Sequence, residues 1–180
     1  MHSLSHLLLL ATLLILSLSI IHVKARGKTP SQLVEEVCSR TGDTSSFCTK
    51  TLESDPRTSS ARDFRALAKI ALDLAVTNST KTEAYIKNML KKNAKPGKLK
   101  SALESCVASY EETIISFRSA LVEIDEDKMS ANYDAKVAGD GPLQCDQALE
   151  SAGVKVESIS MANQITYRFS VIGVEITDLL

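Results

Sequence analysis

Apolar residues recur at helical spacing along nearly all of the chain beyond residue 30. Two short segments, 31–39 and 44–54, flank Gly42 and predict a helical hairpin that ends at Asp55-Pro56. Four longer amphipathic segments follow, over about 60–92, 98–124, 125–153 and 158–179. Helices of similar length with short connections predict an all-α fold, an up-down-up-down four-helix bundle on which the N-terminal hairpin packs.

One stripe of side chains in each long segment is expected to face the core. Ser60 to Asp63 resembles a capping box that would start the first long helix. The third helix is expected to kink or restart at Gly139-Asp140-Gly141-Pro142, with Pro142 at the first helical position. The last helix is rich in valine and isoleucine, so a strand is the competing interpretation, but the period is helical. The expected inward residues are Phe64, Leu67, Ala71, Leu74, Asn78, Tyr85 and Met89; Leu99, Leu103, Cys106, Tyr110, Phe117 and Ile124; Tyr133, Val137, Cys145 and Leu149; and Ile165, Phe169, Ile172, Ile176 and Leu179.

The first residues of the chain have the features of a secretory signal. The apolar run from Leu7 to Ile21 is shorter than the roughly 20 residues that span a bilayer, and Val23-Lys24-Ala25 offers a cleavage site after Ala25. We expect a signal peptide over 1–25, and an uncleaved anchor is the alternative. The remaining 26–180 would form one secreted domain, with no membrane attachment, composed of the hairpin (30–57) and the bundle (60–180).

Four cysteines in a secreted chain most simply form two disulfides. Three pairings of Cys38, Cys48, Cys106 and Cys145 are possible. The first two flank the turn of the predicted hairpin, which would bring them together and leave Cys106 to pair with Cys145. No Cys-x-x-Cys is present, so metal-knuckle and thioredoxin-like sites are excluded.

Composition narrows the possible chemistry. All three histidines lie at or before His22, so the mature domain would lack Ser/His/Asp and Cys/His constellations and histidine-ligated zinc. The formal net charge is −1, and no arginine-rich tract or basic-aromatic interleaving is present, which argues against nucleic acid as a partner. We expect no enzyme activity, cofactor or metal.

Two further motifs are candidate sites. Asp125-Glu126-Asp127 begins like a calcium loop, but Met129, Ser130 and Lys136 occupy ligand, glycine and glutamate positions, so a helix start is the preferred interpretation. Asn78-Ser79-Thr80 is a glycosylation sequon on the inward stripe. Either the helix loosens there and Asn78 carries a glycan, or Asn78 is a buried polar residue; the sequence favours neither.

Several of these features occur together in one known family. The signal peptide, the Cys38/Cys48 hairpin, the run Leu52-Glu53-Ser54-Asp55-Pro56-Arg57 and the helix start Asp63-Phe64-Arg65-Ala66-Leu67-Ala68 resemble the plant invertase and pectin methylesterase inhibitor family. Cys106 with Tyr110, and Tyr133 with Lys136-Val137 before Cys145, match it as well, and invertase-inhibitor-like pollen allergens are especially similar. The resemblance covers about 31–180.

The resemblance implies a secreted, apoplastic inhibitor that forms a reversible one-to-one complex over the active-site cleft of a carbohydrate-active enzyme. It implies the same two disulfide pairs. It also implies that contacts come from the second and third bundle helices, about 98–124 and 126–151. Acidic and polar side chains there would supply hydrogen bonds at the rim, namely Glu111, Glu112, Asp134 and Asp140.

The expected target follows from one short stretch. Invertase inhibitors often carry Pro-Lys-Phe where the third bundle helix begins, and this chain has Asp127-Lys128-Met129. Only Lys128 is retained, so pectin methylesterase is the favoured target and acid invertase the alternative. Lys128 would contact the enzyme or remain solvated, and Met129 would lie at the interface or in the core.

Three other classes of function compete with inhibition. Four-helix signalling proteins also have few disulfides and no catalytic residues, but the Cys38/Cys48 hairpin and the Ser-Asp-Pro-Arg run argue against that class. A small-molecule carrier would need a lined apolar cavity. An enzyme is the least supported class.

Overall fold

The computed structural model describes residues 27–93 and 95–180. The predicted signal peptide lies outside these residues. Within them the secondary structure is helical, and the fold class predicted from the sequence is confirmed. No helix within 27–93 or 95–180 is long and apolar enough to cross a membrane.

The N-terminal hairpin consists of α2 (Pro30–Arg40), the 3-10 turn η1 (Gly42–Thr44) and α3 (Ser45–Ser54), followed by η2 (Pro56–Ser60). Thr29 and Gln32 form a capping box at the start of α2. Gly42 adopts a φ of 58°, which favours glycine and allows the tight turn. The turn brings the Cα atoms of Cys38 and Cys48 to 5.5 Å, and their sulfurs are bonded.

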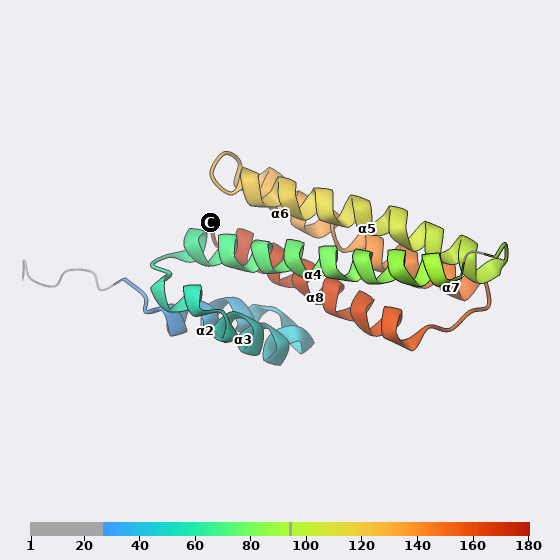
Figure 1. The fold of residues 1–180 in the computed structure, drawn as a ribbon. Helices are drawn as coiled ribbons and strands as arrows, with labels where there is room; N and C mark the ends of the chain where they lie inside the picture. The colour runs from blue at the N-terminus through green and yellow to red at the C-terminus, as the bar shows by residue number, and fades with distance from the viewer. Residues whose placement is uncertain (1–26, 94) are drawn as a thin grey trace, which may run out of the picture.

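The bundle is built from five helices that occupy four positions (Figure 1). Its third position holds two short helices in succession. In sequence order each position packs on the next, and the last helix packs back on the first, which closes the ring. The helices are α4 (Phe64–Lys92), α5 (Lys98–Glu123), α6 (Lys128–Val137), α7 (Asp140–Ser151) and α8 (Glu157–Thr177).

Two helix starts differ from the sequence prediction. Ser60 belongs to η2 and its hydroxyl donates to the Arg57 carbonyl oxygen, whereas Asp63 caps α4 by accepting from the Ala66 amide. The predicted capping box is therefore wrong by three residues. The third segment restarts at Asp140, so Pro142 is the third residue of α7. Pro142 is tolerated there because the first-turn amides have no intrahelical acceptor.

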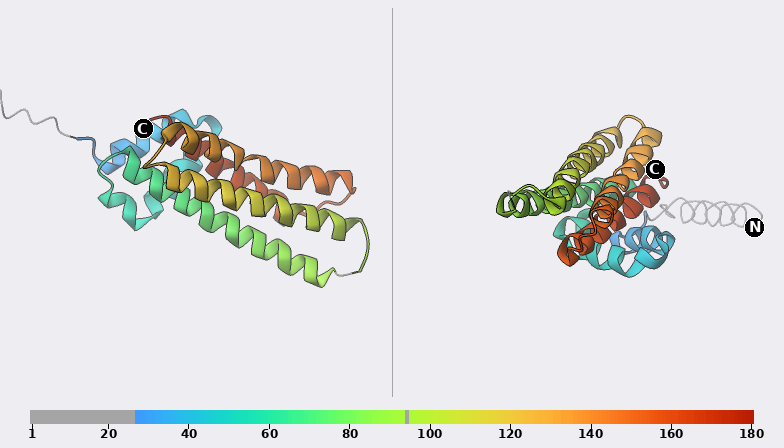
Figure 2. Two further views of the ribbon diagram at one scale, coloured as in Figure 1. Left: turned by 90° about the horizontal axis from the view of Figure 1, so that it is seen from above. Right: turned by 90° about the vertical axis from the view of Figure 1, so that its right-hand side faces the viewer.

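The hairpin packs against the second half of α8 (Figure 2). Phe47 of α3 meets Phe169 of α8 edge to face, with ring centroids 5.4 Å apart. Arg40 Nε donates to Glu175 at 3.0 Å. The buried apolar residues of the hairpin and those of the adjoining end of the bundle form one continuous core.

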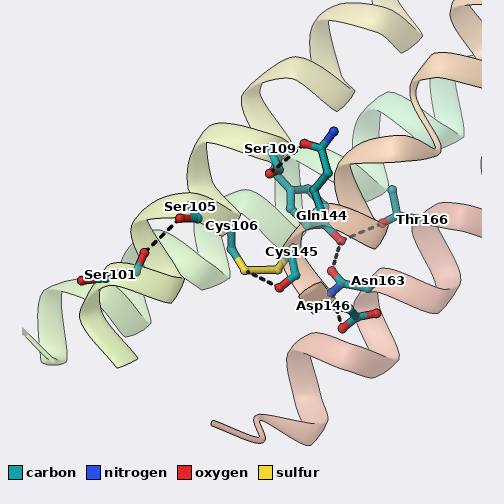
Figure 3. Close-up of a disulfide and its surroundings, with 10 residues drawn as sticks. Ser101, Ser105, Cys106, Ser109, Gln144, Cys145, Asp146, Asn163 and Thr166 are labelled. Atoms are coloured by element: carbon teal, nitrogen blue, oxygen red, sulfur yellow. Dashed lines mark hydrogen bonds between the residues drawn. A yellow bond between two sulfur atoms is a disulfide. The ribbon is translucent and has the colours of Figure 1, made fainter. Parts of the chain in front are cut away.

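A second apolar core lies at the other end of the bundle, around the Cys106–Cys145 disulfide. The Cα atoms of these cysteines are only 4.4 Å apart, so α5 and α7 approach closely. Beside the disulfide lies a buried polar layer (Figure 3). The Tyr110 hydroxyl donates to Asn163 at 2.8 Å, and Asn163 in turn donates to Asp146 at 2.8 Å. Burial raises the pKa of Tyr110, so its hydroxyl keeps its proton.

Most of the predicted inward stripes face the core, but two residues of α4 and α8 do not. Tyr85 and Ile165 are exposed. The Tyr85 hydroxyl of α4 lies 2.7 Å from the Ser158 hydroxyl of α8. In α8 the inward positions between Ile159 and Phe169 are filled by Asn163 and Thr166, which serve the polar layer.

Candidate functional site

The bundle side opposite the hairpin carries a set of large apolar side chains exposed to solvent. It is formed by α5 and by α6 and α7, which lie away from α2 and α3 (Figure 1). Met129 is 75 % exposed and Tyr133 66 %, while Ile115 and Val122 are each 62 % exposed. We call this set, completed by Leu143 of α7, the α5–α7 face. Ile115 borders α4, where it lines a pocket with Thr80 and Glu83, and Met129 borders α8, so the set is spread across the face. Large exposed apolar side chains are typical of protein interfaces.

Close helix packing explains why Tyr133 points outward. The inward side of α6 and the residue after it present only alanines, Ala131, Ala135 and Ala138, all fully buried. A Cβ on Gly173 of α8 would lie 3.1 Å from the Ala135 Cβ, so larger residues do not fit between the two helices. The sequence expectation that Tyr133 faces the core is therefore wrong, and Tyr110, on α5, is buried as expected.

The start of α6 fixes Lys128 and Met129 at the edge of this face. Asp127 caps the helix, accepting from the Met129 amide and the Ser130 hydroxyl, both at 2.9 Å. These hydrogen bonds hold the pKa of Asp127 below its usual range. The helix-start interpretation of this acidic cluster is thus the observed one. Both Lys128 and Met129 are exposed, and they line a pocket with Asn132 and Thr177.

The acidic residues expected at the rim differ in their surroundings. Glu112 and Asp140 are exposed. Glu111 is exposed but accepts from Lys87 of α4 at 2.9 Å, so it already has a cationic partner. Asp134 is partly buried between α6 and α5 and lies near Glu123.

Glu123, at the end of α5, is a partly buried carboxyl group that the sequence did not predict. Its Oε2 is buried without a hydrogen-bond partner. Burial raises the pKa of Glu123, and the nearby carboxylates of Asp134, Asp127 and Glu126 raise it further. The last turn of α5 therefore holds a carboxyl group whose pKa lies above the ordinary value for glutamate.

Replacing this group should change how stability depends on pH. A carboxyl whose folded pKa is raised stabilises the fold below its unfolded pKa, and that contribution is lost as pH rises through the folded value. We expect Glu123→Gln to raise the melting temperature at pH 7 and to lose this advantage as pH falls toward 4. Glu112→Gln, an exposed glutamate on the same helix, is the control. A pH-independent difference for Glu123→Gln would contradict the assignment.

Asn78 lies in an unbroken part of α4. Its side-chain Nδ2 donates to the Thr166 hydroxyl at 3.0 Å, and the side chain is partly buried. The helix therefore does not loosen at the sequon, and Asn78 is partly rather than fully buried. Glycosylation of Asn78 stays a prediction.

Three members of the α5–α7 face were missed from the sequence, namely Ile115, Val122 and Leu143. The seven-residue spacing of Ile115 and Val122, opposite the predicted inward stripe of α5, was a usable signal. Within 27–93 and 95–180, no group of three or more His, Cys, Asp or Glu side chains could hold a metal ion.

These features describe a disulfide-bonded helical bundle with large apolar side chains exposed on α5, α6 and α7. Residues 32–173 match the family model described as plant invertase/pectin methylesterase inhibitor. The chain belongs to this family, whose members are inhibitors and not enzymes.

The relatives include inhibitors of both enzyme classes. A pectinesterase inhibitor from Actinidia deliciosa is 31% identical over 77% of this chain and 74% of its own. A cell wall/vacuolar inhibitor of fructosidase from Arabidopsis thaliana is 32% identical over 77% of this chain and 74% of its own. A crystal structure of a mutant pectin methylesterase inhibitor from Arabidopsis superposes with a TM-score of 0.70 at 25% identity, covering 80% of this chain and 94% of that one.

Proposed function

We propose that this protein inhibits pectin methylesterase by covering the enzyme's active-site cleft reversibly, in a one-to-one complex, with its α5–α7 face. The observation that carries the proposal is the exposure of Met129, Tyr133, Ile115 and Val122 on adjacent helices. Large side chains that are solvated in the free protein gain the most when a partner removes them from water. The pectinesterase inhibitor from Actinidia supports the choice of enzyme.

Acid invertase is the second candidate target. Lys128 is exposed at the start of α6, beside the pocket that it lines with Met129. The Arabidopsis inhibitor of fructosidase and a putative invertase inhibitor from Platanus orientalis, 29% identical over 74% of this chain, support this alternative. The titration below decides between the two enzymes.

Secretion to the cell wall is part of the proposal. The apolar run from Leu7 to Ile21 and the cleavage motif at Ala25 support it. The two disulfides also suit an oxidising compartment.

The test combines a titration with a pair of matched double variants. The oxidised protein is titrated into assays of a plant pectin methylesterase and an acid invertase. We expect Met129→Ala with Tyr133→Ala to raise the inhibition constant about 30-fold, because we expect the two truncations together to cost about 2 kcal/mol of binding free energy. Met161→Ala with Tyr167→Ala removes the same two residue types from α8, where both are exposed, and should change it less than about twofold.

Each outcome bears on a separate part of the proposal. Inhibition of invertase alone would transfer the proposal to the second target. Inhibition of neither enzyme would contradict the function. An equal loss of inhibition in both double variants would contradict the assignment to the α5–α7 face.

A further inference from the structure

Positive charge is concentrated at the end of the bundle where α4 meets α5. Between Glu83 and Glu104 the sequence contains no Asp or Glu and six lysines. Five of them surround the turn, and we call these five the lysine tip: Lys91, Lys92, Lys95, Lys98 and Lys100. A chain whose formal net charge is −1 thus carries a strongly basic end.

The described residues leave most of this charge unpaired. Among them, Lys100 pairs with Glu104 at 3.6 Å, and the other four lysines of the tip are exposed and have no carboxylate partner. The connection between α7 and α8 lies at the same end (Figure 1) and carries Lys155, which pairs with Glu157 at 3.1 Å. The exposed Glu150 in the last turn of α7 adds one further negative charge at this end, against the four exposed lysines of the tip that have no carboxylate partner among the described residues.

Folding does not account for these lysines. Cations in the last turn of a helix are favoured by the helix dipole, which explains Lys91 and Lys92 at the end of α4. Lys98 and Lys100 occupy the first turn of α5, where the dipole disfavours cations, and no acidic residue is present there. Repulsion among the lysines adds to this cost, so an external anion would stabilise the arrangement.

The residue types at the tip favour one class of anionic partner over nucleic acid and membranes. No arginine or aromatic residue lies within 91–100, so the tip lacks the groups that stack on nucleic-acid bases. Among the described residues between Tyr85 and Ile115, no large apolar side chain is exposed, and exposed apolar side chains are what an interfacial helix inserts into a membrane. Lysine ammonium groups are compact charges on flexible stems, so they can reach carboxylates spaced along a polymer.

We propose that the lysine tip binds a polyuronate, a linear polysaccharide with a free carboxylate on its sugars. This inference rests on the proposed function, because hydrolysis of the methyl esters of pectin leaves such a polymer as the enzyme's product. The tip is separated from Ile115 by 17 residues of α5, about 25 Å of helix. The protein can therefore hold the polymer at one end while its α5–α7 face covers the enzyme, which concentrates the inhibitor where the enzyme has acted.

The test measures binding to polygalacturonate and to highly methyl-esterified pectin at low and moderate salt. We expect binding to polygalacturonate alone, weakened strongly between 50 and 200 mM NaCl because the contacts are solvated charges. The triple variant Lys92→Gln, Lys95→Gln and Lys98→Gln should bind about tenfold more weakly. The control triple Lys50→Gln, Arg62→Gln and Arg168→Gln removes the same charge from exposed positions on the other side of the molecule and should bind within about twofold of wild type.

Four results would overturn the inference. They are no binding to polygalacturonate, equal binding to esterified pectin, an equal loss in the control triple, and binding to single-stranded DNA as tight as to polygalacturonate. Inhibition assays on the same triples separate this inference from the proposed function. We expect the tip triple to lose polymer binding and to keep inhibition, a result that leaves the proposed function unchanged. If the unmodified protein binds the polymer but inhibits neither enzyme, only the proposed function is overturned.

Discussion

Replacing Cys106 and Cys145 together with alanine should lower the free energy of unfolding by about 4 kcal/mol, because the disulfide closes a loop of 39 residues. In a domain of this size such a loss corresponds to a fall in melting temperature of about 10 °C. Both cysteines are fully buried, so the two truncations also leave a small cavity that adds to the loss. Thermal or urea unfolding under non-reducing conditions measures the change.

The hairpin disulfide provides the matched comparison. Cys38 and Cys48 are separated by 10 residues, and their replacement should cost about 2.7 kcal/mol. The two pairs should also differ in their effect on inhibition. Cys145 holds α7 against α5 beneath the α5–α7 face, whereas the hairpin packs on α8. A larger loss of stability or of inhibition from the hairpin variant would contradict this account.

Helical periodicity was sufficient to predict the bundle because each long helix buries one apolar stripe. Leu67, Leu103 and Phe117, for example, are fully buried as their spacing requires. The family resemblance read from the sequence agrees with the family model and the curated relatives. Boundaries were less predictable, because both Ser60 and Asp63 are residues that can cap a helix and only tertiary structure selects between them.

The binding face could be predicted only in part, for a physical reason. Helical periodicity assigns large apolar residues to the core. A binding interface carries the same residue types on the protein surface, so periodicity alone does not distinguish the two. In α6 the core side is occupied by alanines because Gly173 and Ala135 bring α8 and α6 into close contact. Nothing in the local sequence reports that distance, so Tyr133 was assigned to the wrong side. Glu123 was missed for a similar reason, since its burial depends on how α6 turns back on α5.

At Gly141 the close approach of α7 to α5 leaves no room for a side chain. We expect Gly141→Ala to destabilise the protein by about 2 kcal/mol. A Cβ at this position would lie 2.1 Å from the Thr113 hydroxyl oxygen and 2.4 Å from the Ser109 carbonyl oxygen, both on α5. Alanine gains about 1 kcal/mol in helix propensity over glycine, so the steric cost must exceed that gain. The disulfide at Cys145, one turn further along α7, prevents the helix from moving away.

Two further variants make the Gly141 result decisive. Gly97→Ala is the control, because a Cβ there meets nothing within 4 Å and the backbone is extended; its unfolding free energy should change by less than about 0.5 kcal/mol. Adding Thr113→Ala to Gly141→Ala should restore only part of the loss, since the Ser109 carbonyl is backbone and remains in place. Full recovery in the double variant would show that the hydroxyl alone limits the approach of α7 to α5, and unchanged stability of Gly141→Ala would show that the two helices can separate without cost.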